Sequence, residues 1–205
     1  MHFIIAIICL FLIIPCSLSA REDVTAPSYL LVEKETFQVI SGRNYDHKHA
    51  PASTTKVLTT IVALEQLRGD ETIIPDKAVL NIPASKLSLI PGKHYQAIDL
   101  IKGTMIESAN DAAYTIATHI GGSEESFART MNDKARTIGA YDSNFKNASG
   151  LFVEGQYTTC WDLALMFRYA LESDSFRNII ATRYFLFNDS KRSVRYKNHN
   201  RPEAF

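Results

Sequence analysis

The first group of residues that could do chemistry is Ser53 and Lys56, in the stretch Ala50–Leu58. Apolar residues recur at helical spacing from Val57 onward, which predicts a helix with Ser53 and Lys56 one turn apart on one face. A serine hydroxyl becomes a useful nucleophile when a base takes its proton, and a lysine whose pKa is lowered by burial can be that base. The pattern therefore indicates acyl transfer.

A structural interpretation competes with this one. Serine is a favoured residue at helix N-termini, and lysine is common on helices. The chain also holds a second Ser-x-x-Lys, Ser143 to Lys146, among turn-forming residues. The spacing alone therefore does not separate a catalytic pair from a helix cap, and the rest of the chain has to decide.

The second group is Ser108-Ala109-Asn110, between two predicted helices. A serine and an asparagine two positions apart in a tight bend can both face one cleft. The hydroxyl could relay a proton there, and the amide could hold a substrate carbonyl. The alternative is that Ser108 and Asn110 cap the helix that begins at Asp111.

The elements that must position these residues are mainly helical. The patterns predict helices at 53–68, 98–106, 110–120, 123–138 and 158–171, and strands at 28–32, 37–40, 184–187 and 193–197. Helices between N-terminal and C-terminal strands predict an α/β (α+β) fold in which a helical cluster packs on an antiparallel sheet. We expect the distant strands to meet in that sheet.

The composition is that of an ordinary globular protein, with 205 residues, 46% of them hydrophobic and 21% charged. Twenty-two basic residues balance twenty-two acidic ones, so the net charge gives no indication of a nucleic-acid partner. The histidines show no zinc-ligand spacing. We therefore expect one domain over residues 21–205, without a zinc site built from its histidines.

The N-terminus predicts a secretory signal peptide at residues 1–20. An apolar run from Phe3 to Pro15 is followed by small residues up to Ala20 and then by charged residues. A retained N-terminal anchor is the alternative. Removal of the leader would leave Cys160 as the one cysteine, which we interpret as a packing residue.

Together the two groups resemble motifs of serine acyl-transfer enzymes that act on penicillin-like substrates. The chain resembles the low-molecular-mass penicillin-binding proteins that are serine-type D-alanyl-D-alanine carboxypeptidases, over Tyr29 to Asn200. The segments that carry the resemblance follow in order: Pro51 to Lys56, Leu89 to Gly92, Ser108 to Ala113, Gly122 to Phe127, Asn147 with Gly150-Leu151, Gly155 to Thr159, and Asp162 to Ala164.

The resemblance implies a role for each site residue. Ser53 would attack the terminal D-Ala-D-Ala bond of a peptidoglycan stem peptide, and Lys56 would take its proton. Ser108 would pass a proton to the leaving amine, and Asn110 would bind the substrate's amide oxygen. β-Lactams would acylate Ser53 as inhibitors. The enzyme would work in the periplasm or cell envelope, without metal or cofactor.

The third motif of the family, Lys-Thr-Gly, is absent from the sequence. Asn198 to Asn200 resembles the segment that precedes it, so we expect a chain truncated before that motif, with an incomplete sheet, an uncovered sheet edge and an exposed apolar face. A peripheral membrane contact would belong to the missing C-terminal part. One alternative is an inactive remnant that binds peptidoglycan or a partner. Another is a β-lactamase, although no Glu-x-x-Leu-Asn loop is present.

Overall fold

The computed structural model describes residues 24–189 and 192–199. The predicted signal peptide lies outside them. The helical elements are η1 (Ala52–Thr54), α1 (Thr55–Gln66), η2 (Lys77–Asn81), α2 (Ala97–Ile106), α3 (Asn110–Gly121), α4 (Glu124–Ile138), α5 (Cys160–Ala170) and α6 (Asp174–Ile180). The antiparallel strand pairs are β1 (Tyr29–Val32) with β2 (Val39–Arg43), β3 (Thr72–Ile73) with β4 (Tyr95–Gln96), and β5 (Tyr184–Asp189) with β6 (Arg192–Lys197).

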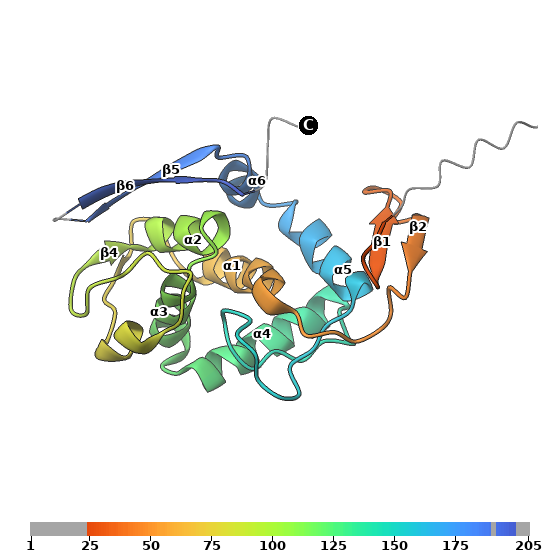
Figure 1. The fold of residues 1–205 in the computed structure, drawn as a ribbon, viewed down its shortest axis with the longest axis horizontal. Helices are drawn as coiled ribbons and strands as arrows, with labels where there is room; N and C mark the ends of the chain where they lie inside the picture. Colours follow the sequence, from red (N-terminus) through yellow and green to blue (C-terminus); the bar gives the residue numbers. More distant parts are fainter. Residues whose placement is uncertain (1–23, 190–191, 200–205) are drawn as a thin grey trace, which may run out of the picture.

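Helix α1 is the centre of the molecule, and the other five α-helices contact it (Figure 1). Leu58, Ile61 and Val62 are buried, and so are the polar Thr59 and Thr60. The hydroxyl of Thr59 donates a 2.7 Å hydrogen bond to the carbonyl of Ala148, which satisfies one polar group inside the core. Burial on all sides explains why the sequence of this helix has almost no polar face.

Helices α2, α3 and α4 confirm the predicted segments to within two residues. Gly122 and Gly139 follow α3 and α4 with positive φ angles of 73° and 95°, where a glycine ends a helix at little cost. Ser123 caps α4 by accepting a 3.1 Å hydrogen bond from the Ser126 amide. The apolar side chains of Phe127 and Met131, one helical turn apart on α4, are buried.

Helix α5 confirms the predicted segment at 158–171, beginning at Cys160 because Thr159 caps it with its hydroxyl. Helix α6 was not predicted. It has only seven residues, so its two buried apolar side chains, Phe176 and Ile179, do not form a long periodic pattern. None of the described helices is long and apolar enough to cross a membrane.

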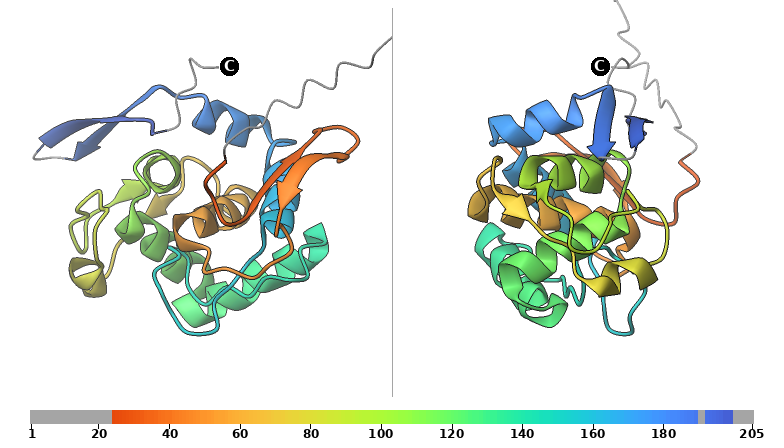
Figure 2. Two further views of the ribbon diagram at one scale, coloured as in Figure 1. Left: turned by 45° about the vertical axis from the view of Figure 1, so that its right-hand side comes forward. Right: turned by 90° about the vertical axis from the view of Figure 1, so that its left-hand side faces the viewer.

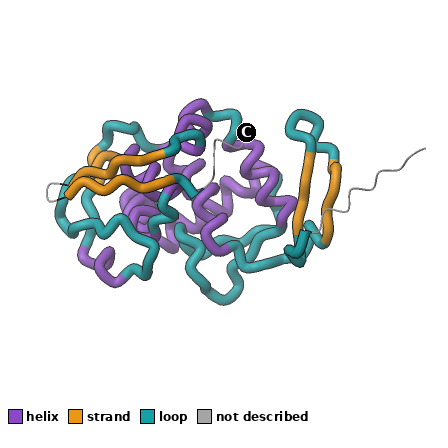
Figure 3. The backbone as a smooth tube through the Cα atoms, turned by 45° about the horizontal axis from the view of Figure 1, so that its top comes forward, coloured by secondary structure: helices purple, strands orange, loops and turns teal. Residues whose placement is uncertain are grey.

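The fold is of the predicted mixed class, with helices against short antiparallel sheets, but the expectation that N-terminal and C-terminal strands meet is wrong for the described residues. Hairpins β1–β2 and β5–β6 stand at opposite ends of the helical cluster (Figures 2 and 3). Each of these strands pairs with its neighbour in the sequence, β1 with β2 and β5 with β6, and α1, α2 and α5 lie between the two hairpins (Figure 1).

An apolar groove of about 710 Å³ runs from β1 to the residues after β6. Tyr29 and Leu30 of β1 line it, together with Leu163 and Phe167 of α5 and His199. The groove is the predicted apolar face, and among the described strands β1 and β2 pair with each other alone, which leaves their outer edges uncovered by a further strand. Ser53 and Lys56 also reach this groove.

Candidate functional site

Ser53 and Lys56 lie at the N-terminal end of the central helix. Ser53 belongs to the 3₁₀ turn η1, and Lys56 is the second residue of α1. Lys56 Nζ lies 3.3 Å from Ser53 Oγ. It also donates hydrogen bonds to Asn110 Oδ1 at 2.8 Å and to the Ser149 carbonyl at 2.6 Å. The amine thus joins the serine hydroxyl to two other segments of the chain.

Lys56 is 2% exposed, and its acceptors are neutral. Burial lowers the pKa of Lys56 from 10.5 to about 8. Among the described residues, no carboxylate forms an ion pair with Lys56 that would stabilise the charged amine and raise its pKa. At pH 7 about one lysine in ten is then neutral, against fewer than about one in a thousand at the ordinary pKa. The geometry and the charge state both suit a base for Ser53.

Ser108 lies in the turn between α2 and α3, and Asn110 is the first residue of α3. Ser108 has a φ of 58°, in the left-handed region, which reverses the chain there. The residue that precedes α3 as its N-cap is Ala109, and no side chain caps this helix. The interpretation of Ser108 and Asn110 as helix caps is therefore wrong.

The side chain of Asn110 is held at both ends. Its Nδ2 donates to the carbonyls of Pro83 at 3.1 Å and Ala84 at 2.9 Å, while its Oδ1 accepts from Lys56. Both amide protons are therefore in use, so binding a substrate carbonyl at Nδ2 requires one of these two bonds to open.

A cavity of about 340 Å³ brings the predicted residues together. Ser53, Ser108 and Asn110 all line it, and its far side is the segment 149–153. Lys56 lies behind Ser53, on the side of the apolar groove. The two short sequence motifs, more than fifty residues apart, thus face one cavity.

Sequence reasoning missed two groups that support this site. The Ser149 carbonyl binds Lys56, and no residue type signals a backbone acceptor in a sequence. The buried carboxylate of Asp111 accepts backbone hydrogen bonds from Leu87 at 2.9 Å and Leu89 at 3.0 Å. It thereby fixes the segment that holds Asn110. An acidic residue in the first turn of a helix is the signal that could have found it.

The loop at 147–151 packs directly on the turn that carries Ser53. Asn147 shapes the loop, accepting from the Gly150 amide at 2.7 Å and donating to the Leu151 carbonyl at 2.8 Å. Gly150 has a φ of 82°, and a Cβ atom added there would overlap the carbonyl of Ala52. Only glycine allows this close approach.

The second Ser-x-x-Lys pair has a structural role. The hydroxyl of Ser143 donates to Asp162 Oδ2 at 2.7 Å and lies 2.8 Å from Thr158 Oγ1. These bonds tie the loop before the site to α5. In the part of the chain that the structure describes, no group of three or more His, Cys, Asp or Glu side chains is arranged to hold a metal ion.

Comparison with known families matches residues 16–204 to the D-alanyl-D-alanine carboxypeptidases of peptidase family S11. The chain belongs to this family. Among curated D-alanyl-D-alanine carboxypeptidases, DacF of Bacillus subtilis is 34% identical over 162 residues, which are 77% of this chain and 42% of that protein. DacB2 of Mycobacterium tuberculosis is 35% identical over 161 residues, which are 78% and 55% of the two chains.

Solved structures of this family share the fold. A D-alanyl-D-alanine carboxypeptidase from Mycobacterium tuberculosis superimposes with a TM-score of 0.81 and 32% identity, over 85% of this chain and 67% of that one. DacD from Francisella tularensis gives 0.79 and 31%, over 85% and 44%. The chain spans about half the length of the curated carboxypeptidases it matches.

Proposed function

We propose that this chain is a serine D-alanyl-D-alanine carboxypeptidase that trims peptidoglycan stem peptides through an acyl-enzyme on Ser53. The observation that carries the proposal is the Lys56 amine, buried among neutral acceptors and 3.3 Å from Ser53 Oγ. A buried lysine beside a serine has a cost in stability that packing alone does not require. Membership of the carboxypeptidase family supports the same chemistry.

Acylation would begin with Ser53. Its Oγ forms a bond to the carbonyl carbon of the terminal D-Ala-D-Ala linkage, and its proton passes to neutral Lys56. The C–N bond then breaks, and free D-alanine leaves after its nitrogen takes a proton through Ser108. Water attacks the ester and restores Ser53. Asn110 would hold the amide oxygen of the substrate, after one of its bonds to Pro83 or Ala84 opens.

The oxyanion would form beside the start of the central helix. The backbone N–H of Ser53 would donate to it, a kind of interaction whose loss costs about 3 kcal/mol of transition-state stabilisation. The Lys-Thr-Gly motif, which in the family supplies a cation for the substrate carboxylate, is not in this sequence. The proposed machinery of this chain is therefore the nucleophile, its base, the proton relay, one oxyanion donor and the amide of Asn110.

The proposal includes a place of action and an inhibitor. Peptidoglycan lies outside the cytoplasmic membrane, and the apolar N-terminal segment with small residues before Arg21 supports secretion to the periplasm or envelope. β-Lactams, whose strained amide mimics D-Ala-D-Ala, would acylate the same hydroxyl.

Covalent labelling with a fluorescent penicillin tests the proposal. We expect labelling of the chain, its loss in Ser53→Ala, and normal labelling in the matched variant Ser143→Ala. Equal labelling of wild type and Ser53→Ala would refute the assignment. A folded chain without labelling would favour the non-catalytic binding alternative. Release of D-alanine from a pentapeptide would indicate a carboxypeptidase, whereas rapid hydrolysis of penicillin would indicate a β-lactamase.

A further inference from the structure

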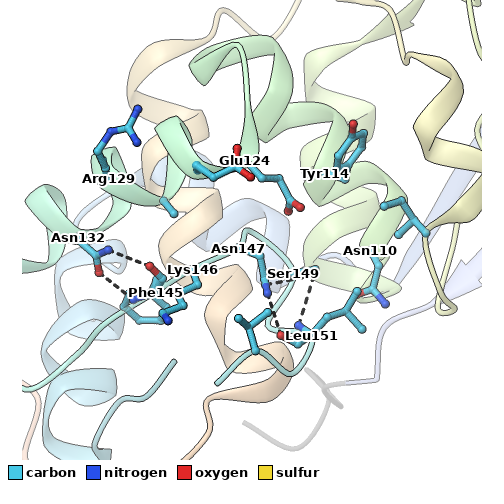
Figure 4. Close-up of a pocket in the computed structure, with 14 residues that line it drawn as sticks. Asn110, Tyr114, Glu124, Arg129, Asn132, Phe145, Lys146, Asn147, Ser149 and Leu151 are labelled. Atoms are coloured by element: carbon cyan, nitrogen blue, oxygen red, sulfur yellow. Dashed lines mark hydrogen bonds between the residues drawn. The ribbon is translucent and has the colours of Figure 1, made fainter. Parts of the chain in front are cut away.

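A second cavity, of about 580 Å³, adjoins the one that contains Ser53. The two cavities share Asn110, Ser149, Leu151 and Val153 as lining residues. A ligand that reaches from one to the other therefore passes the asparagine that would hold a substrate amide. Figure 4 shows this cavity, with Glu124 on α4 and the loop from Asn147 to Leu151 below it in that view.

Glu124 is the half-buried charged residue of this cavity, whereas Glu125, Arg129 and Lys146, which also line it, are exposed. Oε1 of Glu124 accepts a long hydrogen bond of 3.3 Å from the Ala148 amide. Burial raises the pKa of Glu124. Within residues 24–189 and 192–199, no Lys, Arg or His pairs with this carboxylate. Its place at the start of α4 stabilises the carboxylate in part, and a cationic ligand in the cavity would stabilise it further.

The other charged groups of the cavity do not satisfy Glu124. Hydrogen bonds from the backbone and from Ser123 lower the pKa of Glu125, and the charge of Arg129, one helical turn further along α4, adds to this effect. Lys146 is exposed at the rim. Apolar residues supply much of the remaining wall, so a ligand with a hydrocarbon chain that ends in a cation would match the lining: Ile82, Ala128, Leu151 and Val153.

We propose that this cavity is a subsite for the stem peptide on the N-terminal side of the scissile bond, and that Glu124 binds an ammonium group at the end of an aliphatic side chain of that peptide. This subsite rests on the proposed function, because it assumes that the substrate is acylated at Ser53. It assigns a specificity to a part of the molecule that takes no part in bond breaking.

The test compares two fluorescent peptides that end in D-Ala-D-Ala and differ only at one side-chain amine, which is free in one and acetylated in the other. Binding is measured by anisotropy on the Ser53→Ala protein, which does not turn the peptides over. We expect the free amine to bind about 3- to 10-fold more tightly, as for a partly exposed ion pair. Equal affinities, or no binding of either peptide, would overturn the subsite.

Glu124→Gln in the same background locates the effect. Glutamine keeps an oxygen for the Ala148 amide but lacks the charge, so the preference for the free amine should fall to about onefold. Asp133→Asn, an exposed change on the same helix that lies outside the cavity, should keep the full preference. A preference that survives in Glu124→Gln would exclude Glu124 as the partner. Penicillin labelling of the chain with Ser53 intact tests the proposed function separately. A penicillin that carries no amine has no ammonium group for Glu124 to bind, so its reaction with Ser53 does not depend on the subsite.

Discussion

Asn110 Oδ1 lies 2.8 Å from Lys56 Nζ, so an amide that begins one helix is in direct contact with the amine of another. The amide is oriented by the carbonyls of Pro83 and Ala84, which take both of its protons. The oxygen therefore has to face Lys56. A neutral acceptor at this position binds the amine without stabilising its positive charge as a carboxylate would.

Asn110→Asp should raise the pH at which acylation becomes fast. A carboxylate in place of the amide oxygen would raise the pKa of Lys56, so that less neutral amine is present at pH 7. The aspartate would also face two carbonyls without a proton to donate, and thermal stability should fall. Penicillin labelling rates from pH 6 to 10 check the first effect. The exposed variant Asn178→Asp should leave the profile unchanged, and an unshifted profile in Asn110→Asp would contradict this role of the amide.

In the wild-type chain, labelling should accelerate as pH rises and level off above about pH 8, the lowered pKa of Lys56. Measured rates with fluorescent penicillin give this midpoint directly. A midpoint near 10.5 would mean that burial does not lower the pKa of the amine, and a profile flat from pH 6 to 10 would mean that Lys56 is not the base.

The same pKa predicts how stability depends on pH. Between about pH 8 and 10.5 the folded chain holds a neutral Lys56 while the unfolded chain still binds the proton, so the free energy of unfolding rises with pH. Below that window both states are charged, and the cost of burying the charge is fully present. Urea unfolding of wild type against Lys56→Met should show a stability difference that grows in favour of wild type from pH 8 to 10. Lys77→Met, an exposed control, should give a constant difference.

Gly150→Ala should disrupt the site, because its Cβ would overlap the Ala52 carbonyl next to Ser53. We expect a loss of more than about 4 kcal/mol of stability, or no folded protein. Gly92 has a similar φ of 75° with open space around it, so Gly92→Ala should cost only about 1 kcal/mol, the backbone strain alone. Thermal unfolding of the two variants measures the difference. Similar losses would show that the close approach is not what requires glycine.

Asp111→Asn should destabilise the segment that orients Asn110. One carboxylate oxygen becomes an NH₂ group that faces the backbone N–H of Leu87 or Leu89, which leaves a buried donor without an acceptor. The expected loss is about 2 to 4 kcal/mol. Asp76→Asn, at the start of η2, should change stability little because asparagine caps as well as aspartate does. Equal melting temperatures for Asp111→Asn and wild type would contradict the proposed anchor.

The features predicted correctly from the sequence are those that depend on residues close together in the chain. Ser123 and Gly139 bound α4 because capping is local chemistry, and the pair Ser53 and Lys56 meets because one helical turn fixes its geometry. The two motifs predicted which residues line the candidate cavity. The sequence could not predict that Asn110 contacts Lys56 instead of capping α3, because that contact depends on how the helices pack.

What the sequence could not predict depends on distant backbone groups. The Ser149 carbonyl has no residue-type signature, and neither do the carbonyls that orient Asn110. Hairpins β1–β2 and β5–β6 show the same limit for the sheet, since β propensity identifies a strand but not its partner. Helix α6 was missed because two buried residues in seven form no pattern.

The amine of Lys56 donates hydrogen bonds to Asn110 and Ser149, which lie 54 and 93 residues further along the chain. Contacts over such separations form late, because each closes a large loop of chain before it gains any energy. During refolding, a molecule with α1 already formed would hold its serine and lysine side by side, but the amine would still be hydrated and charged. The rate at which reactivity toward penicillin appears during refolding would thus report on the last stage of folding. Intermediates that have secondary structure alone would not be labelled.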